Sequence, residues 1–243
     1  DKMPSPRIAT RKFADDHLDT LSRTITSSPL QAACELIANA YDADAAQVTV
    51  MLVPGKRTLI IEDNGAGMTS DEVEHQFYRI GGSKKKQNRT TPKGRTMLGS
   101  FGQATLALRM LGENYLLETV KEGTQTRVSE QFGETLSLEH RLELHESPST
   151  AKSGTRLTIE GLLPSEREGF TPQTLKDHLA RTMPIDAEEN PHPFALYVNN
   201  MRVVPRRIEN AQLFTFEETL PKGGKVKVKI YLAARPIPED AGV

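Results

Sequence analysis

The sequence has no tryptophan, one cysteine and few aromatic residues, which make up 5% of its 243 residues. Cys34 cannot form a disulfide within the chain, and no group of cysteines and histidines has the spacing of a zinc site. No apolar run approaches the ~20 residues of a membrane-spanning helix, and the first residues lack the pattern of a signal peptide. We therefore expect a cytoplasmic protein that has no membrane segment and no disulfide framework.

An excess of charge of either sign is also missing. The chain has 31 Lys and Arg residues against 32 Asp and Glu residues, a formal net charge of -1. This balance argues against general coating of nucleic acid and against a polybasic membrane anchor. The length exceeds one typical domain of ~150 residues, so we expect one large domain and a second, smaller piece.

Hydrophobic periodicity predicts a mixture of helices and strands. The predicted helices cover 13–25, 29–41, 71–77, 101–111 and 172–182. The predicted strands cover 47–53, 57–62, 115–120, 125–132, 135–144, 155–160, 194–198, 201–204, 213–218 and 225–232. The four alternating segments between 115 and 160 favour an antiparallel meander.

Three segments do not fit this regular pattern. Residues 1–11 contain two prolines and are expected to form a loose arm. Residues 81–95 have almost no apolar side chain, and loops of this length are usually functional or disordered. Residues 162–169 include Pro164 and resemble a linker, so a domain boundary is expected there.

One predicted helix carries a stripe of polar residues. Glu35, Asn39 and Asp42 stand at positions i, i+4 and i+7, which places them on one face of the helix. Taken alone, such a triple is more often a solvated face than a site. The other motifs of the chain change this balance.

Three glycine-containing motifs follow the polar stripe. Asp63-Asn64-Gly65-Ala66-Gly67 ends a strand and allows tight turning, although alone it could be an ordinary Asn-Gly turn. Residues 98–104 place spaced glycines at the start of a helix, where free amides bind phosphate or where glycine simply helps helix packing. Ser153-Gly154-Thr155 precedes a strand, in which Thr155 could be only a β-forming residue.

The order and spacing of the four motifs resemble those of the GHKL superfamily, which includes gyrase, the large heat-shock chaperones, histidine kinases and MutL. The stretch from Glu35 to Ala43 resembles the N box, E-x-x-x-N-A-x-D-A, and the motif at Asp63 resembles the adenine-binding box, D-x-G-x-G. Residues 80–84, Ile-Gly-Gly-Ser-Lys, resemble the start of the ATP lid in chaperone-like and MORC-like members. The chain is therefore similar to the chaperone-like or MORC-like branch.

The resemblance implies an α/β fold of two layers, the Bergerat-type sandwich, in which a mixed, mostly antiparallel sheet carries helices on one face. It implies an N-terminal arm at 1–11 and an ATP-binding domain at 12–162, with a lid at about 79–98. Residues 170–243 are then the start of a second, transducer-like α/β domain, which is short for a complete one.

The same resemblance assigns a role to each motif residue of the first half. Glu35 is implied as the general base, Asn39 as the Mg²⁺ ligand, and Asp42 as a contact to adenine or to water on the ribose side. Asp63 would accept a hydrogen bond from the adenine amino group, which selects adenine over guanine. The backbone would pass close to the base at Gly65 and Gly67, and Met68 would form an apolar wall.

The later motifs are implied to bind the phosphates and to complete the adenine site. Residues Gly99, Ser100, Phe101 and Gly102 would give amides to the phosphates, and Thr155 would give a hydroxyl to the adenine network. Lys84 is a further candidate for phosphate contact. The sequence departs from many relatives at Ala104, where they carry glycine.

The activity implied is a slow ATPase with ATP and Mg²⁺ as cofactors, which closes a lid and drives homodimerisation of a molecular clamp. The client could be protein or DNA. Histidine kinases lack an acidic residue at the position of Glu35, so this residue favours hydrolysis, and His17 is interpreted as an exposed helix residue. Two alternatives stay open: a nucleotide-gated dimerisation module with little turnover, and a protein kinase of the same superfamily.

Basic residues gather in the lid and in the second unit. Those of the lid, including Lys93 and Arg95, could close over the triphosphate or contact nucleic acid, but most are expected to be solvated. Relatives supply a Lys or Arg to the γ-phosphate from the transducer. Arg202, Arg206 and Arg207 are present there, but none lies in a motif that identifies this residue.

Overall fold

The computed structural model describes residues 7–12, 28–78, 90–99, 104–132, 139–162, 170–185, 192–205, 212–219 and 225–232. The chain divides into two compact units, Asp1–Pro205 and Arg206–Val243. The predicted helix 13–25 with His17, and the predicted site residues Lys84, Ser100, Phe101 and Gly102, lie outside the described residues, as do Arg206 and Arg207.

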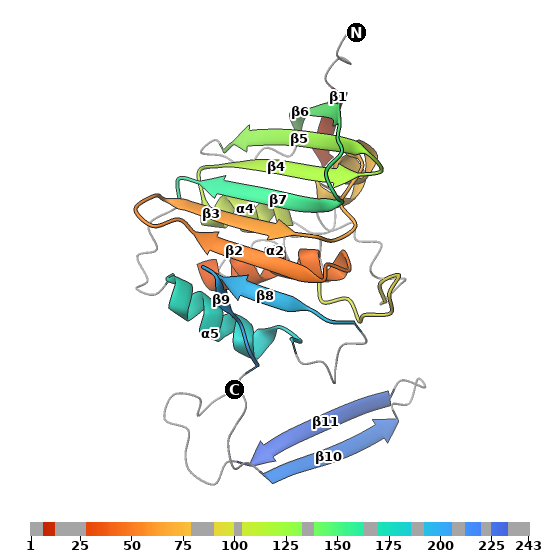
Figure 1. Cartoon of the computed structure of the whole chain (residues 1–243), viewed down its shortest axis with the longest axis vertical. Coiled ribbons are helices and arrows are strands. Elements are labelled where there is room, and N and C mark those ends of the chain that lie inside the picture. Colours follow the sequence, from red (N-terminus) through yellow and green to blue (C-terminus); the bar gives the residue numbers. More distant parts are fainter. Residues whose placement is uncertain are drawn as a thin grey trace. The chain divides into compact units, whose positions relative to one another are not determined.

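Within the described residues, the first unit contains a nine-stranded sheet in the order β1-β6-β5-β4-β7-β3-β2-β8-β9 (Figure 1). The strands are β1 (Arg7–Lys12), β2 (Gln47–Leu52), β3 (Thr58–Asp63), β4 (Asn114–Lys121), β5 (Thr124–Gln131), β6 (Glu139–Pro148), β7 (Gly154–Glu160), β8 (Ala195–Val198) and β9 (Met201–Arg202). Only β2 and β8 pair in parallel among these strands. The mixed, mostly antiparallel sheet is confirmed.

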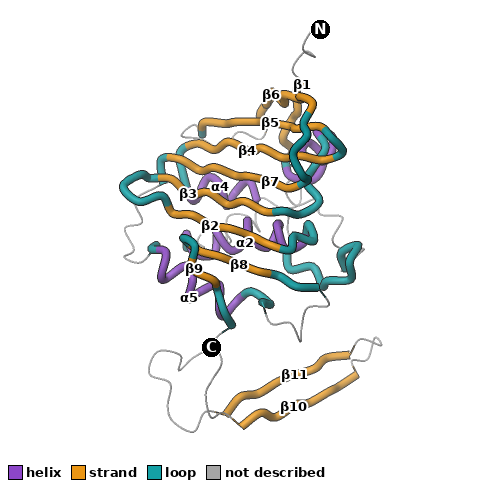
Figure 2. The backbone as a smooth tube through the Cα atoms, in the orientation of Figure 1, coloured by secondary structure: helices purple, strands orange, loops and turns teal. Residues whose placement is uncertain are grey.

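The helices lie on one face of this sheet (Figures 1 and 2). They are α2 (Pro29–Asp42), α3 (Ser70–Glu72), the π-helix η1 (Val73–Phe77), α4 (Ala104–Leu111) and α5 (Pro172–Thr182). Alternate strand residues such as Leu59, Leu117 and Ile159 are buried in one core with Ile37 of α2 and Leu108 of α4. The predicted two-layer sandwich is therefore confirmed.

The helix that carries the polar stripe begins where its sequence predicts. The Ser28 hydroxyl accepts a hydrogen bond from the Gln31 amide at 3.3 Å, and Pro29 occupies the first turn. The helix ends at Asp42, and two residues later Asp44 has a positive φ of 56°. α2 packs against both α4 and α5, so its position in the layer is fixed from two sides.

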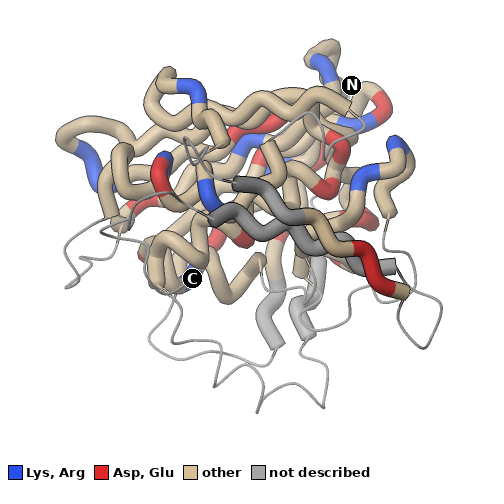
Figure 3. Tube along the Cα trace, turned by 90° about the horizontal axis from the view of Figure 1, so that it is seen from below, with Lys and Arg blue, Asp and Glu red and all other residues tan. Residues whose placement is uncertain are grey.

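The opposite face of the sheet carries paired charges. The Arg156 guanidinium on β7 lies 2.6 Å from a carboxylate oxygen of Glu62 on β3, and the Arg127 guanidinium on β5 lies 3.1 Å from one of Glu118 on β4. All four side chains are partly or largely exposed. Positions of both signs are interspersed along the described chain (Figure 3), which fits a solvated surface rather than a patch of one charge.

The expectation of a loose arm is wrong for Arg7–Lys12. These residues form β1 and pair with residues 139–144 of β6, whereas residues 145–148 of β6 pair with β5. An edge strand of this kind obtains its stability from backbone hydrogen bonds to its neighbour, so it needs little hydrophobic alternation. This explains why the pattern of the sequence did not reveal it.

The units also divide at a different place from the expected linker. Helix α5 packs on α2, and β8 extends the sheet by pairing with β2, so residues 170–205 belong to the first compact unit. The described part of the second unit is the antiparallel pair β10 (Gln212–Thr219) and β11 (Lys225–Leu232). The transducer-like role of 170–243 stays a prediction.

Arg95 fixes the segment 90–99 to the end of α2. This side chain is 1% exposed, and its guanidinium donates to the carbonyl oxygens of Tyr41 and Ala45 at 3.2 and 2.7 Å and to that of Pro193 at 3.0 Å. It also stacks on the rings of Tyr41 and Phe194. Arg95 is therefore a structural residue and not a solvated lid cation.

Lys93 supports the same attachment. Its backbone amide donates to the Asp44 carboxylate at 3.1 Å, and its ammonium donates to the Asp44 carbonyl oxygen at 3.2 Å. The Thr91 hydroxyl donates to the same carboxylate. Asp44, two residues after α2, thus holds the turn at 91–95 through hydrogen bonds to Thr91 and Lys93.

We predict that Arg95→Met lowers the free energy of unfolding by about 3 kcal/mol or more, because the buried carbonyl oxygen of Ala45 loses its Arg95 donor and the bonds from Arg95 to Tyr41 and Pro193 are lost with it. Urea denaturation measures the loss. The matched control is Arg127→Met, which removes a half-exposed ion pair and should cost less than about 1 kcal/mol. Equal, small losses in both variants would contradict the structural role of Arg95.

Candidate nucleotide-binding site

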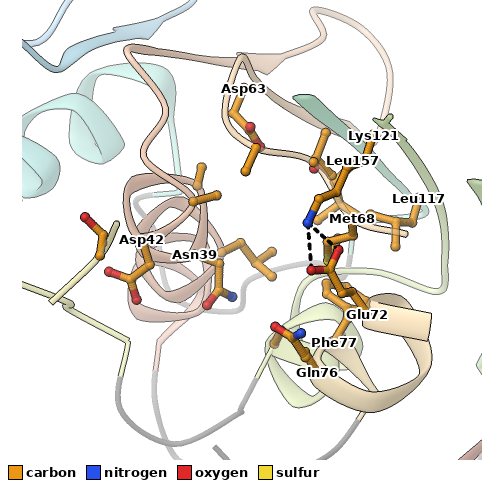
Figure 4. A pocket seen from close by; sticks show the side chains of 18 of the residues that line it. Asn39, Asp42, Asp63, Met68, Glu72, Gln76, Phe77, Leu117, Lys121 and Leu157 are labelled. Atoms are coloured by element: carbon orange, nitrogen blue, oxygen red, sulfur yellow. Dashed lines mark hydrogen bonds and ion pairs between the residues drawn. The ribbon is translucent and has the colours of Figure 1, made fainter. Parts of the chain in front are cut away.

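A cavity of about 710 Å³ lies between α2, the helical segment α3–η1 and the sheet (Figure 4). Asn39 and Asp42 approach it from α2, Asp63 from the end of β3, and Glu72 from the opposite side. The predicted site residues that line it are Asn39, Asp42, Asp63, Gly67, Met68 and Thr155. Three motifs far apart in sequence therefore meet at one cavity, and Ala104, the last residue of the motif at 98–104, also lines it.

The polar stripe of α2 runs beside this cavity. Asn39 lines it in the middle of the helix, and Asp42 lines it one turn later. Glu35 lies one turn before Asn39 and is half-buried, but it is not among the described lining residues. The stripe thus presents an amide and a carboxylate to the cavity, and Glu35 lies one helical turn from the amide.

Asp42 has a contact that the sequence did not reveal. Its two carboxylate oxygens accept hydrogen bonds from the backbone amides of Leu98 and Gly99 at 2.8 and 3.0 Å. Gly99 is the first glycine of the motif expected to contact phosphate. Asp42 therefore holds the start of that segment against α2, in addition to lining the cavity.

Asp63 is a half-buried carboxylate that lines the cavity at the end of β3. One of its oxygens accepts the Gly65 amide at 2.8 Å, and the Thr155 amide donates to the same side chain. Burial raises the pKa of Asp63 to about 6, and these two hydrogen bonds only partly oppose that rise. A ligand that donates a hydrogen bond to the ionised carboxylate would offset its burial.

The glycines of the same motif are required by the surrounding backbone. A β-carbon on Gly65 would lie 2.7 Å from the carbonyl oxygen of Ala43. Gly67 has a φ of +65°, and a β-carbon there would lie 2.0 Å from the carbonyl oxygen of Val120. The turn therefore packs directly on the chain that follows α2 and on the end of β4.

Thr119 of β4 joins three parts of the cavity wall. Its hydroxyl oxygen lies 2.8 Å from the Met68 amide nitrogen, 3.2 Å from the Gly154 carbonyl oxygen and 3.1 Å from the Thr155 hydroxyl oxygen. Thr119 itself is 0% exposed, whereas Met68 and Thr155 line the cavity. This residue thus supports the cavity wall without being part of its surface.

These features agree with the comparison of the sequence with protein families. Residues 26–156, more than half of the chain, match the family of histidine kinase-, DNA gyrase B-, and HSP90-like ATPases. The chain belongs to this GHKL family. The matched range includes all four motifs.

Individual relatives of this GHKL chain match between 57% and 80% of it. It is 26% identical over 195 residues to the "Putative type II restriction enzyme HgiDII" of Herpetosiphon aurantiacus, covering 77% of this chain and 31% of the relative. It is 28% identical over 210 residues to the DNA mismatch repair protein MutL of Shouchella clausii, covering 80% of this chain and 30% of the relative. MutL of Exiguobacterium sibiricum is 31% identical over 139 residues, covering 57% of this chain and 21% of the relative.

The chain therefore spans less than a third of the length of these relatives. The described residues contain no helix long and apolar enough to cross a membrane.

An ion pair at the cavity of this GHKL unit was missed by the sequence analysis. The Lys121 ammonium, at the end of β4, lies 2.7 and 2.8 Å from the two carboxylate oxygens of Glu72 (Figure 4). Burial acts to raise the pKa of Glu72, but Lys121 and the Thr69 amide outweigh it and lower that pKa. Thr69-x-x-Glu72 is a capping-box sequence, so the start of this helix could be predicted from the sequence. The pairing of Glu72 with Lys121 could not be predicted.

We predict that Asp63 makes the ligand-free protein less stable as pH rises. Its pKa is higher in the folded state, about 6, than the ~3.9 of an unfolded chain, so the folded state binds more protons between these values. The stabilisation that the folded protein gains from protonated Asp63 is therefore fully present below about pH 4 and is lost as pH rises through 6. Between pH 5 and pH 8, wild type should lose about 1–2 kcal/mol more than Asp63→Asn in urea denaturation. A difference between the two proteins that does not change with pH would contradict the raised pKa.

Proposed function

We propose that the first unit binds ATP in the cavity and hydrolyses it to ADP and phosphate in a Mg²⁺-dependent reaction. One observation carries this proposal: the half-buried acceptor Asp63 at the end of β3 and the stripe residues Asn39 and Asp42 of α2 line one cavity. A base with an amino group suits the first part. A triphosphate suits the second, where Asp42 fixes the glycine segment.

At the base end, the adenine amino group would donate to Asp63. The ionised carboxylate is an acceptor, so it favours adenine over guanine, which presents a carbonyl at the same edge. Met68, together with Leu117 and Leu157, gives this end apolar walls against which a flat ring can pack.

At the phosphate end, the side chains would provide oxygen ligands for a hard cation. Asn39 would hold Mg²⁺ through its amide oxygen, and the ion would neutralise phosphate charge when bound. Glu35, one helical turn away, would orient the attacking water and take its proton as the oxygen joins the γ-phosphorus. The leaving oxygen then departs on ADP.

We predict that Glu35→Ala lowers the rate of phosphate release from ATP by about 100-fold or more, because the water loses its general base. ATP binding should persist, because the cavity walls are unchanged. Phosphate release with Mg²⁺ and equilibrium binding of ATP are measured side by side. The control Glu143→Ala removes an exposed carboxylate of β6 outside the cavity and should change neither quantity.

The outcomes separate the alternatives. Binding of ATP without release that depends on Glu35 would indicate a nucleotide-gated dimerisation module with little turnover. Transfer of labelled phosphate to protein instead of water would indicate a kinase. Absence of ATP binding in the wild type would contradict the proposed function altogether.

We further propose that ATP closes the lid and drives homodimerisation, so that the protein works as a clamp. The chaperone-like or MORC-like branch remains part of this proposal. Several relatives are named DNA mismatch repair protein MutL, which favours DNA over protein as the client.

The clamp predicts a change of mass with nucleotide. Glu35→Ala loaded with ATP and Mg²⁺ should sediment as a dimer, because the variant cannot leave the ATP state, while the nucleotide-free protein should sediment as a monomer. Analytical ultracentrifugation at several protein concentrations checks this. A single mass in both states would leave an ATPase without a clamp.

A further inference from the structure

The Thr119 hydroxyl has three hydrogen-bond neighbours, one for its hydrogen and one for each of its two lone pairs. A threonine hydroxyl offers one hydrogen and two lone pairs. The Met68 amide can only donate to it, at 2.8 Å, and the Gly154 carbonyl can only accept from it, at 3.2 Å. The third neighbour is the Thr155 hydroxyl at 3.1 Å, which could do either.

These fixed partners decide the direction of the third bond. Since the one hydrogen of Thr119 goes to the Gly154 carbonyl, only a lone pair is left for Thr155. The Thr155 hydroxyl must then donate its own hydrogen to Thr119. Its remaining lone pairs are left for the cavity, which Thr155 lines and Thr119 does not.

We propose that Thr119 is a positioning residue for base selection, because it holds Thr155 as a hydrogen-bond acceptor toward the cavity. This inference rests on the proposed function and adds to it the residue that fixes the direction of the Thr155 hydroxyl, which the resemblance places in the adenine network. Asp63, the other acceptor, accepts the amide of the same Thr155. The base end then presents two acceptors, from the ends of neighbouring strands β3 and β7.

Two acceptors select a purine with an amino group at position 6. The adenine amino group has two hydrogens and can donate to both. Hypoxanthine differs at this edge by a 6-oxo oxygen and a hydrogen on N1, and its oxygen would face lone pairs. If the Thr155 hydrogen were free, it could rotate toward that oxygen and relieve the conflict. Thr119 is the group that prevents this rotation.

Thr126 offers a matched control on the next strand. It lies directly opposite Thr119 in the β4–β5 register, and it is 1% exposed. Its hydroxyl oxygen has no hydrogen-bond partner within the described part of the chain. Thr126→Val therefore makes the same chemical change in the same layer without touching the bonds to Met68, Gly154 or Thr155.

The test compares ATP and inosine triphosphate, measured as dissociation constants by calorimetry with wild type, Thr119→Val, Thr119→Ser and Thr126→Val. Loss of the Met68 bond in Thr119→Val weakens both nucleotides alike, so the informative quantity is their ratio. We expect the preference for ATP to fall about tenfold in Thr119→Val, the effect of one hydrogen bond. It should be unchanged in Thr126→Val and restored in Thr119→Ser.

Thr155→Val tests the same polarity without disturbing the bond from Met68 to Thr119. If Thr155 is an acceptor, its removal takes away the conflict with the 6-oxo oxygen, and the preference for ATP falls. If Thr155 donates into the cavity, its removal costs inosine triphosphate more, and the preference rises. A rise would overturn the inference even if Thr119→Val did not fold.

The inference and the proposed function fail in different ways. Equal weakening of both nucleotides in Thr119→Val, with the wild-type preference kept, would reduce Thr119 to a structural residue. Absence of ATP binding to the wild type would instead remove the proposed function, and this inference with it. A reduced preference in both Thr119→Val and Thr155→Val, with Thr126→Val unchanged, supports the inference.

Discussion

The site depends on how the C-terminal end of α2 is satisfied. The last carbonyl groups of a helix have no partner within the helix, and when they are buried they need donors from elsewhere. Here Arg95 donates to the carbonyl oxygen of Tyr41 in the last turn and to that of Ala45 just beyond the helix, and its side chain is almost fully buried. Asp42 accepts the amide of Gly99 at the same place. One helix end therefore fixes both the polar stripe and the segment that faces it.

A second constraint acts at Asp63. Partial burial makes this carboxylate unfavourable when ionised, and its pKa is raised to about 6 because the two backbone amides compensate the burial incompletely. The ligand-free protein thus keeps an acceptor that lacks a full set of donors. Such a group adds binding energy for a ligand with a suitable hydrogen, and it penalises a ligand with an acceptor there. Stability of the empty fold and selectivity of the site are opposed at this one residue.

Much of this arrangement could be predicted from the sequence, for a physical reason. Ser28-Pro29 marks the start of α2 by local chemistry, and the motifs carry their spacing in the chain itself. What could not be predicted rests on contacts between distant residues. Edge strand β1 has no hydrophobic alternation, and its partner β6 lies more than a hundred residues away. Arg95 looks like one lid cation among several until its buried partners are known, and Thr119 looks like an ordinary strand residue until its three neighbours are placed.

The two ends of the cavity have different chemical demands, and the fold meets them with different elements. Base selection needs acceptors of fixed direction, and rigid strands provide these: backbone amides orient Asp63, and the hydroxyl of Thr119, itself without access to solvent, orients Thr155. In the proposed function, phosphate chemistry needs groups already aimed at the position where charge develops, and these would come from Asn39 on α2 and from the glycine segment held by Asp42. The two groups of residues are also joined through the backbone, because the Ala66 amide donates to the Ala43 carbonyl oxygen at 2.9 Å. Since base selection and phosphate chemistry would rest on different side chains, we expect substitutions of Thr119 or Thr155 to change substrate choice more than turnover.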